Sequence, residues 1–308
     1  MEDDIKDVLS KKDFNIILEK TKNMLKDIDF DKLKQNDYDF DRNYPENFSN
    51  WYPNILDFGK FSHVDIINNQ IFTLKEMEAF ERVDNIDNVD WNEINQILKP
   101  TLDKMKPLRL YSMKNGCFSD KFNFEISTVT KDTLSRKLWE LNYDSHMFET
   151  GGHTELVIRE LIPFDNREYM TIYNGMPLRT EVRVFYNMDT KSIEYMMDYW
   201  DYDYCNQHIS NKNDNLIFNI FHNRIEVPSM IEHKLEYNTV CQLICNAIDT
   251  LKFSNWFTGI WSIDFMYVRE KAKIYLIDMA RGFRSAMWDI DKLTPVTKEM
   301  LLNERTNK

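Results

Sequence analysis

Two periodicities alternate along the chain, one typical of amphipathic helices and one typical of buried strands. Apolar positions recur at helical spacing in residues 3–35, and again in "VDWNEINQILKPTL", "KDTLSRKLWELN" and "SMIEHKLEYNTVCQLICNAIDTLKF". Apolar runs of strand length occur in "LRLYSMKNG", "ELVIRELI", "LRTEVRVFYN" and "SIEYMMDYWDYDY". Because the strands are grouped and the helices interspersed without a regular βαβ order, the pattern predicts an α+β fold.

Residues 261–282, "WSIDFMYVREKAKIYLIDMARG", predict a β-hairpin with one aspartate in each strand. Two apolar runs flank a polar stretch that suits a loop of about three to five residues. A hairpin symmetric about Lys271 places Asp264 opposite Asp278. The same register pairs Ile263 with Met279, Phe265 with Ile277, Met266 with Leu276, Tyr267 with Tyr275 and Val268 with Ile274. Both faces are then apolar, so we expect the hairpin to be covered on both sides.

The predicted aspartate pair requires a positive charge nearby. Opposed side chains in an antiparallel pair lie about 5 Å apart, and like charges there destabilise the sheet. A hard divalent cation suits carboxylate oxygens, and Arg281 is a competing internal cation. The alternative is structural: one aspartate forms a hydrogen bond at a loop end and the other a salt bridge.

Composition restricts the class of protein. A chain of 308 residues with 43% hydrophobic residues predicts a globular protein of one large or two ordinary domains. The formal charge of −12 argues against a general nucleic-acid or anionic-membrane binder. We expect no signal peptide and no membrane-spanning segment, because the chain shows neither pattern. Four cysteines without a CxxC pair, and six histidines without HExxH spacing, predict free thiols in the cytoplasm and no histidine-based metal site.

Charged residues interrupt several of the predicted strands. Lys114 ends the first strand and enters a loop that contains Gly116, Ser119 and Lys121. Arg159 and Glu160 interrupt the apolar strand "ELVIRELI". A buried-looking strand tolerates such charges only where they have partners.

The strand "LRTEVRVFYN" carries a further set of charges on one face, namely Arg179, Glu181 and Arg183. A half-solvated strand would explain Glu181 taken alone. Taken together, the strands offer cations for phosphates and carboxylates for a metal, which a nucleoside triphosphate with magnesium requires. The seven glycines form neither GxGxxG nor GxxxxGK[ST], so the Rossmann and Walker phosphate motifs are absent.

The order of these segments resembles the ATP-grasp superfamily. It is most similar to a clade of small, often phage-associated proteins, marked by two arginines and a lysine, that also includes the eukaryotic chaperone for assembly of translation initiation factor 2. The similarity covers residues 105–285. It consists of the two lysines of the loop, the arginine strand "LVIRELI", the E-x-R-x-F strand "EVRVF" and the pattern "W-x-x-D-F … I-Y-L-I-D".

The resemblance implies a two-lobed fold with ATP between the lobes. It gives an N-terminal helical extension (1–45), a first lobe with the lysine loop (46–153) and a second lobe with the acidic hairpin (154–308). Asp264 and Asp278 would bind Mg²⁺, and Arg183 and Arg281 would be catalytic. The residues implied to bind ATP are Lys114, Lys121, Arg159, Glu160, Leu161, Ile162 and Arg183, with 160–162 around adenine.

Two features depart from the family pattern. Ala280 stands where most ATP-grasp ligases have an asparagine that binds a second metal, and the glycine-rich lid is reduced to Gly116. These departures leave ATP binding intact as a prediction and weaken the case for fast catalysis.

Three functions are compared on this basis. The first is an ATP-dependent carboxylate–amine ligase that forms an acyl phosphate from a small-molecule or peptide carboxylate. The alternative is an ATP-binding protein-assembly chaperone that acts on a protein client without ligase turnover. A nucleic-acid ligase is disfavoured, because its Lys-x-Asp/Asn-Gly motif needs one residue more than "MKNG" provides. We expect neither a nucleic acid nor a membrane as partner.

Overall fold

The computed structural model of the chain describes residues 29–81, 86–116, 118, 120, 123–147, 154–164, 169–223 and 228–306. The chain divides into a unit that ends at Phe40 and a unit that begins at Asp41, and each is treated by itself. The described part of the first unit is helical, since α3 runs over Phe30–Arg42. Most of the amphipathic pattern predicted over residues 3–35 lies outside the described residues.

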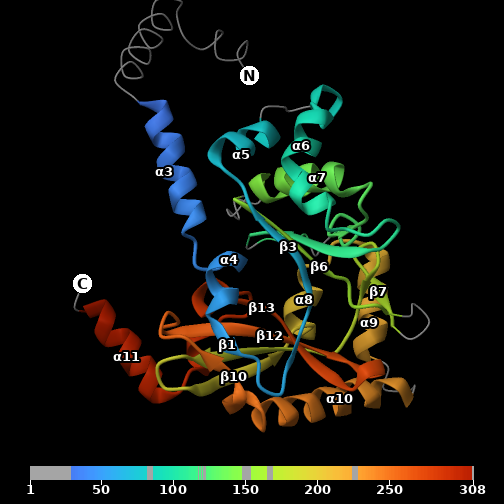
Figure 1. The fold of residues 1–308 in the computed structure, drawn as a ribbon. Helices are drawn as coiled ribbons and strands as arrows, with labels where there is room; N and C mark the ends of the chain where they lie inside the picture. The colour runs from blue at the N-terminus through green and yellow to red at the C-terminus, as the bar shows by residue number, and fades with distance from the viewer. Residues whose placement is uncertain are drawn as a thin grey trace, which may run out of the picture. The chain divides into compact units, whose positions relative to one another are not determined.

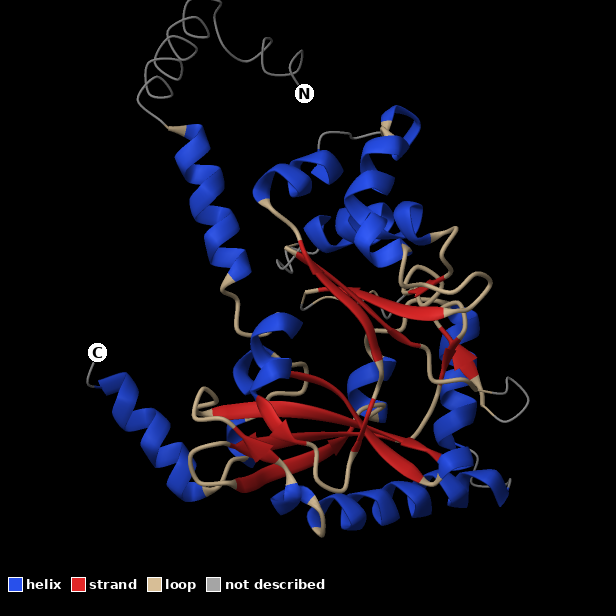
Figure 2. Ribbon diagram, in the orientation of Figure 1, coloured by secondary structure: helices blue, strands red, loops and turns tan. Residues whose placement is uncertain are grey.

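Two antiparallel-rich sheets frame the second unit (Figures 1 and 2). The four-stranded sheet has the order β3 (Ile66–Ile71), β6 (Glu155–Glu160), β4 (Tyr111–Asn115) and β5 (Thr128–Val129). The five-stranded sheet has the order β10 (Ser192–Asp198), β9 (Glu181–Asn187), β12 (Ile260–Val268), β13 (Lys273–Arg281) and β2 (Ser62–His63), with only β2 parallel to its neighbour. Two small ribbons pair β1 (Ile55–Asp57) with β11 (Lys252–Phe253) and β7 (Thr171–Ile172) with β8 (Met176–Pro177).

Helices cover the outer faces of both sheets (Figure 1). On the four-stranded sheet α6 packs against β3 and α7 against β4, while α10 packs against β9 of the other sheet. The helices are α4 (Phe48–Trp51), α5 (Leu74–Glu81), α6 (Trp91–Leu102), α7 (Leu134–Met147), α8 (Tyr202–Asn206), α9 (Lys212–Asn223), α10 (Pro228–Cys245) and α11 (Pro295–Thr306). This mixture confirms the α+β class. No helix among the described residues is both long enough and apolar enough to cross a bilayer.

One predicted strand is wrong in its second half. The pattern "SIEYMMDYWDYDY" predicted a single strand, but β10 ends at Asp198 and α8 begins at Tyr202. The carboxylate of Asp201 accepts a hydrogen bond from the backbone N–H of Tyr204, which is the bond of a helix N-cap. The capping aspartate therefore overrides the β propensity of the surrounding aromatic residues.

The β12–β13 hairpin has the predicted register at its open end and a different one near its turn. Ile263 pairs with Met279 and Asp264 with Asp278, as predicted. Beyond that point a β-bulge at Ile277 shifts the pairing by one residue, so Phe265 lies opposite Leu276 rather than Ile277. The other predicted pairs are wrong for the same reason: the structure pairs Met266 with Tyr275, Tyr267 with Ile274 and Val268 with Lys273.

The bulge places both aspartates on one face. Without it, continuation of the inner register would put Ile277 opposite Asp264 and turn Asp278 to the other side. The hairpin is covered on both faces, as predicted. The main core contains Ile263 and Phe265 on one face, and a smaller cluster contains Val268 and Tyr275 on the aspartates' face.

Candidate functional site

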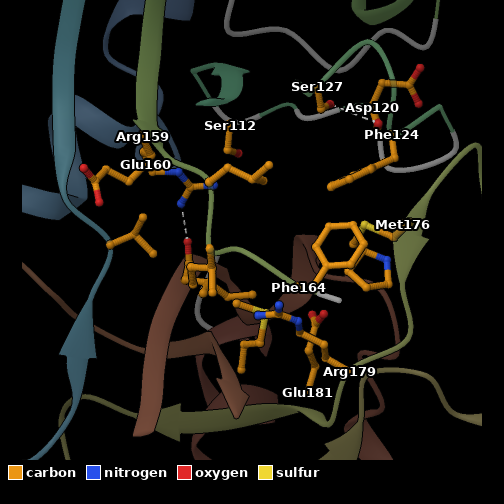
Figure 3. Close-up of a pocket in the computed structure, with 16 residues that line it drawn as sticks. Ser112, Asp120, Phe124, Ser127, Arg159, Glu160, Phe164, Met176, Arg179 and Glu181 are labelled. Carbon is orange, nitrogen blue, oxygen red and sulfur yellow. Dashed lines mark hydrogen bonds between the residues drawn. The ribbon is translucent and has the colours of Figure 1, made fainter. Parts of the chain in front are cut away.

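A pocket lies between the two sheets and takes side chains from both (Figure 3). Its cavity has a volume of about 130 Å³. Most of its lining is apolar, with a few charged groups, which is the usual composition of a small-molecule site. The lining residues are Val64, Ser112, Asp120, Phe124, Ser127, Arg159, Glu160, Leu161, Ile162, Phe164, Met176, Pro177, Arg179, Glu181, Met266 and Ile277.

Two ion pairs lie beside the pocket and account for the opposed aspartates. Lys114 Nζ contacts both carboxylate oxygens of Asp278, at 2.9 and 3.0 Å. Arg183 forms a bidentate salt bridge with Asp264, in which Nε donates to Oδ1 at 2.7 Å and Nη2 donates to Oδ2 at 2.8 Å. The cations that relieve the repulsion are therefore Lys114 and Arg183 rather than Arg281.

These ion pairs are buried, so removing one partner of a pair would cost more free energy than at the surface. Lys114 is 1% exposed, and both Arg183 and Asp264 are buried. Burial by itself lowers the pKa of Arg183, but the adjacent Asp264 carboxylate more than offsets this, and the pKa is raised. The Asp278 side chain is 24% exposed, so this pair reaches solvent on one side.

The pocket and the ion pairs are linked by strand geometry. Side chains two residues apart in a strand share a face and lie about 7 Å from one another. Three strands each carry one pocket residue and one member of the ion pairs at this spacing: Ser112 and Lys114 on β4, Glu181 and Arg183 on β9, and Met266 and Asp264 on β12. The ion pairs therefore lie one strand step beyond the pocket.

Arg159 connects β6 to the acidic hairpin. Its Nη1 donates a hydrogen bond of 2.7 Å to the backbone carbonyl of Ile277, the residue at the bulge (Figure 3). Burial lowers the pKa of Arg159, and the nearby Asp278 carboxylate opposes this effect. The arginine thus holds the four-stranded sheet against the strand that carries one of the aspartates.

The segment after β6 forms a wall of the pocket. Strand pairing ends at Glu160, whose side chain forms an ion pair with Arg109. Leu161 and Ile162 follow and line the cavity. The peptide groups after Glu160 lie outside the paired strand.

Some predicted residues are not brought to this place. Arg281 pairs with Trp261 and, by alternation along β13, shares the face of Met279 rather than that of Asp278. The structure therefore does not join Arg281 to the ion pairs. Lys121 lies outside the described residues.

Strand β9 is more deeply buried than its alternating charges suggest. A half-solvated strand was an explanation for Glu181, but every residue of β9 is buried. The sequence placed Arg179 among the charges of this face but did not single it out as a site residue, although it lines the pocket. Phe164, another lining residue, had no recognisable signal in the sequence.

Carboxylate oxygens at Asp264 and Asp278 are chemically suited to Mg²⁺. Within the part of the chain that the structure describes, no group of three or more His, Cys, Asp or Glu side chains is placed to hold a metal ion. Ala280, which pairs with Ser262, offers no side-chain ligand. Among the His, Cys, Asp and Glu side chains that the structure describes, a magnesium ion here would have these two carboxylates as ligands, and phosphate oxygens and water would complete its shell.

Comparisons with known proteins give little further guidance. No family model matches the chain, and no curated protein does. A structure of Cdc123 from Schizosaccharomyces pombe is similar over 79% of this chain and 86% of that one, at 13% identity and a TM-score of 0.45. A C-terminally truncated form of Cdc123 from the same organism gives the same coverage at 12% identity and a TM-score of 0.46. At this similarity we rest no argument on either structure.

Proposed function

We propose that this chain binds a nucleoside triphosphate together with Mg²⁺, and that the nucleotide is ATP, as the family resemblance implies. One observation carries the proposal: on β4, β9 and β12 a pocket residue and a charged member of the ion pairs lie two residues apart on the same face. The base would occupy the apolar pocket. The phosphates would then extend over Lys114 and Arg183, next to the two aspartates.

Ligand contacts can replace the ion pairs and still leave every charged side chain of the pairs with a partner of opposite charge. Phosphate oxygens would take over Lys114 and Arg183, and Mg²⁺ would bind the carboxylates of Asp264 and Asp278 that those cations release. Mg²⁺ alone would leave two buried cations without counter-ions, and nucleotide alone would bring phosphates against carboxylates. Either state is costly in a buried site, so we expect metal and nucleotide to bind together.

Within this proposal the chain acts as an ATP-binding assembly chaperone for a protein client, without ligase turnover. Two observations support binding over catalysis. Ala280 provides no ligand for a second metal ion, and Arg281, the second predicted catalytic arginine, shares the face opposite the aspartates. The carboxylate–amine ligase stays a prediction, because no contact described here favours it.

Calorimetric titration with ATP, with and without Mg²⁺, tests the proposal. Wild type is expected to bind ATP at least tenfold more tightly with Mg²⁺, and Asp278→Asn to lose that metal dependence because one of the two metal-binding carboxylates is gone. Asp132→Asn, at an exposed position before α7, is the matched control and should behave as wild type.

Two results would contradict the proposal in different ways. Folded wild type that binds no ATP would mean that the ion pairs are purely structural. Release of ADP and phosphate only when an acid and an amine are both supplied would replace the chaperone by the ligase.

A further inference from the structure

A third arginine, Arg179, lies four residues before Arg183 in the chain and, unlike Arg183, lines the pocket. Arg179 lies two residues before the start of β9, lines the pocket and is 1% exposed. Glu181 lies between the two arginines in the sequence. It lines the pocket together with Arg179 (Figure 3). This segment therefore presents a cation, a carboxylate and a second cation in turn, and the second cation, Arg183, is the partner of Asp264.

The guanidinium of Arg179 is incompletely bonded. Its Nη2 donates to the carbonyl of Pro163 at 2.6 Å, and its Cζ lies 5.6 and 5.0 Å from the ring centres of Phe164 and Tyr169. Its Nε and Nη1 are buried and have no hydrogen-bond partner among the residues that the structure describes. Burial lowers its pKa, against the opposing effect of Tyr169, Glu270 and Glu181.

Arg183, on β9, is a buried arginine whose hydrogen bonds are made. Its Nε and Nη2 bind both oxygens of Asp264, and its Nη1 donates to the carbonyl of Ala286 at 3.0 Å. Buried polar groups in proteins are nearly always bonded, and an exception calls for an explanation. For Arg179 the adjoining cavity provides such an explanation. A ligand in the cavity could offer an acceptor, and rotation of the long arginine side chain would bring its unbonded N–H groups to it.

We propose that Arg179 and Glu181 together read the edge of the nucleobase. The inference rests on the proposed function. Arg179 donates to a ring nitrogen or carbonyl oxygen of the base, and Glu181 accepts from a neighbouring amino or imino N–H group. Adenine and guanine both present such an edge, but with donor and acceptor exchanged at the 6-position, so a fixed donor and acceptor in the protein distinguish them.

The test measures the affinity of the full chain for ATP, GTP and inorganic triphosphate, each with Mg²⁺. Wild type is expected to bind ATP about tenfold or more tightly than GTP. Arg179→Met should bring ATP and GTP within about threefold of each other and leave the affinity for inorganic triphosphate unchanged. Lys114→Met is the contrasting variant, since it should weaken all three ligands.

Thermal unfolding separates recognition from a structural role. A structural Arg179 would lower the melting temperature when replaced, whereas the unmade bonds of Arg179 predict that Arg179→Met melts at or above the wild-type temperature. Glu181→Gln keeps the size of the side chain and should also reduce the ATP/GTP preference. It provides a second variant if Arg179→Met does not fold.

The outcomes are distinguishable. Wild type that binds ATP and GTP equally, or Arg179→Met that keeps the wild-type ratio, overturns this inference and leaves the proposed function standing. Folded wild type that binds no nucleotide overturns both.

Discussion

Glu155 and Glu194 bind backbone N–H groups, whereas Asp264 and Asp278 bind the charged side chains of Arg183 and Lys114. Both oxygens of Glu155 accept from the N–H of Ser49, in the first turn of α4, at 3.2 Å. Glu194 accepts from the N–H of Thr294, just before α11, at 2.9 Å. All four carboxylates therefore have partners, but the partners differ in kind.

The difference lies in whether the partner can be taken over by a ligand. A backbone N–H at a helix start is fixed in place and has no competing acceptor, so a carboxylate bound to it stabilises the fold. A lysine or arginine binds phosphate as readily as carboxylate. A ligand can thus replace the carboxylates in the two ion pairs beside the pocket, while the contacts of Glu155 and Glu194 are permanent.

The largest expected effect comes from breaking the Arg183–Asp264 pair. Asp264→Asn leaves the buried Arg183 without a counter-ion and should lower the free energy of unfolding by about 3–5 kcal/mol. The measurement is urea unfolding of the protein without nucleotide.

The double variant Arg183→Met/Asp264→Leu is the control for that experiment. Replacing both charges by apolar groups should recover most of the lost stability and abolish ATP binding, which separates the two roles of the pair. A single variant as stable as wild type would contradict the importance of this contact.

An intermediate effect is expected for Glu155→Gln. Loss of the charge on a carboxylate bonded to the start of α4 should cost about 1–2 kcal/mol of unfolding free energy. Since this contact is structural, the affinity for ATP should not change. Loss of ATP binding at unchanged stability would remove the distinction between the two kinds of carboxylate.

The smallest effect is a pH dependence at Glu194. Burial alone would raise its pKa, but the hydrogen bonds from Thr297, Thr294 and Asn187 outweigh this and lower it. Its contribution is therefore present above the ordinary pKa and lost as the pH falls through the folded-state value. Glu194→Gln should be less stable than wild type by about 0.5–1 kcal/mol at pH 7, and the difference should disappear at the acid end of a pH series.

Glu46 is a control, because its effect on stability should change with pH in the opposite direction to that of Glu194. Burial raises its pKa, and its Oε2 has no hydrogen-bond partner among the described residues. The stability linked to it is present at low pH and lost as the pH rises through the folded-state pKa. Glu46→Gln should thus gain on wild type as the pH rises, while Glu194→Gln falls behind.

The sequence predicted the parts of the fold that depend on local pattern. Alternation along the hairpin was enough to place Asp264 opposite Asp278 and to predict cover on both faces. The bulge was not predictable in this way. Tyr275, Leu276 and Ile277 are all apolar, so a shift of one residue leaves both faces apolar and the pattern cannot fix the register.

The sequence singled out several charged residues on strands, but it did not predict which of them pair. Lys114 and Asp278 are 164 residues apart in the chain, and their contact depends on how two sheets pack together. Arg281 was expected among the site residues as a cation close to the aspartates and through the family resemblance, but strand alternation places it on the opposite face. Arg179 was visible as a charge on a strand, and only the cavity beside it indicated a role.

The bulge at Ile277 makes the length of β13 more important than its composition. Between the turn and Asp278, a conservative substitution changes one contact. A deletion of one residue instead turns the side chains beyond it to the opposite face of the strand. Variants of this chain that retain the site should therefore accept changes of apolar residue in this segment and reject insertions and deletions. In an alignment of such variants, the number of residues before the second aspartate would identify the site better than their identity.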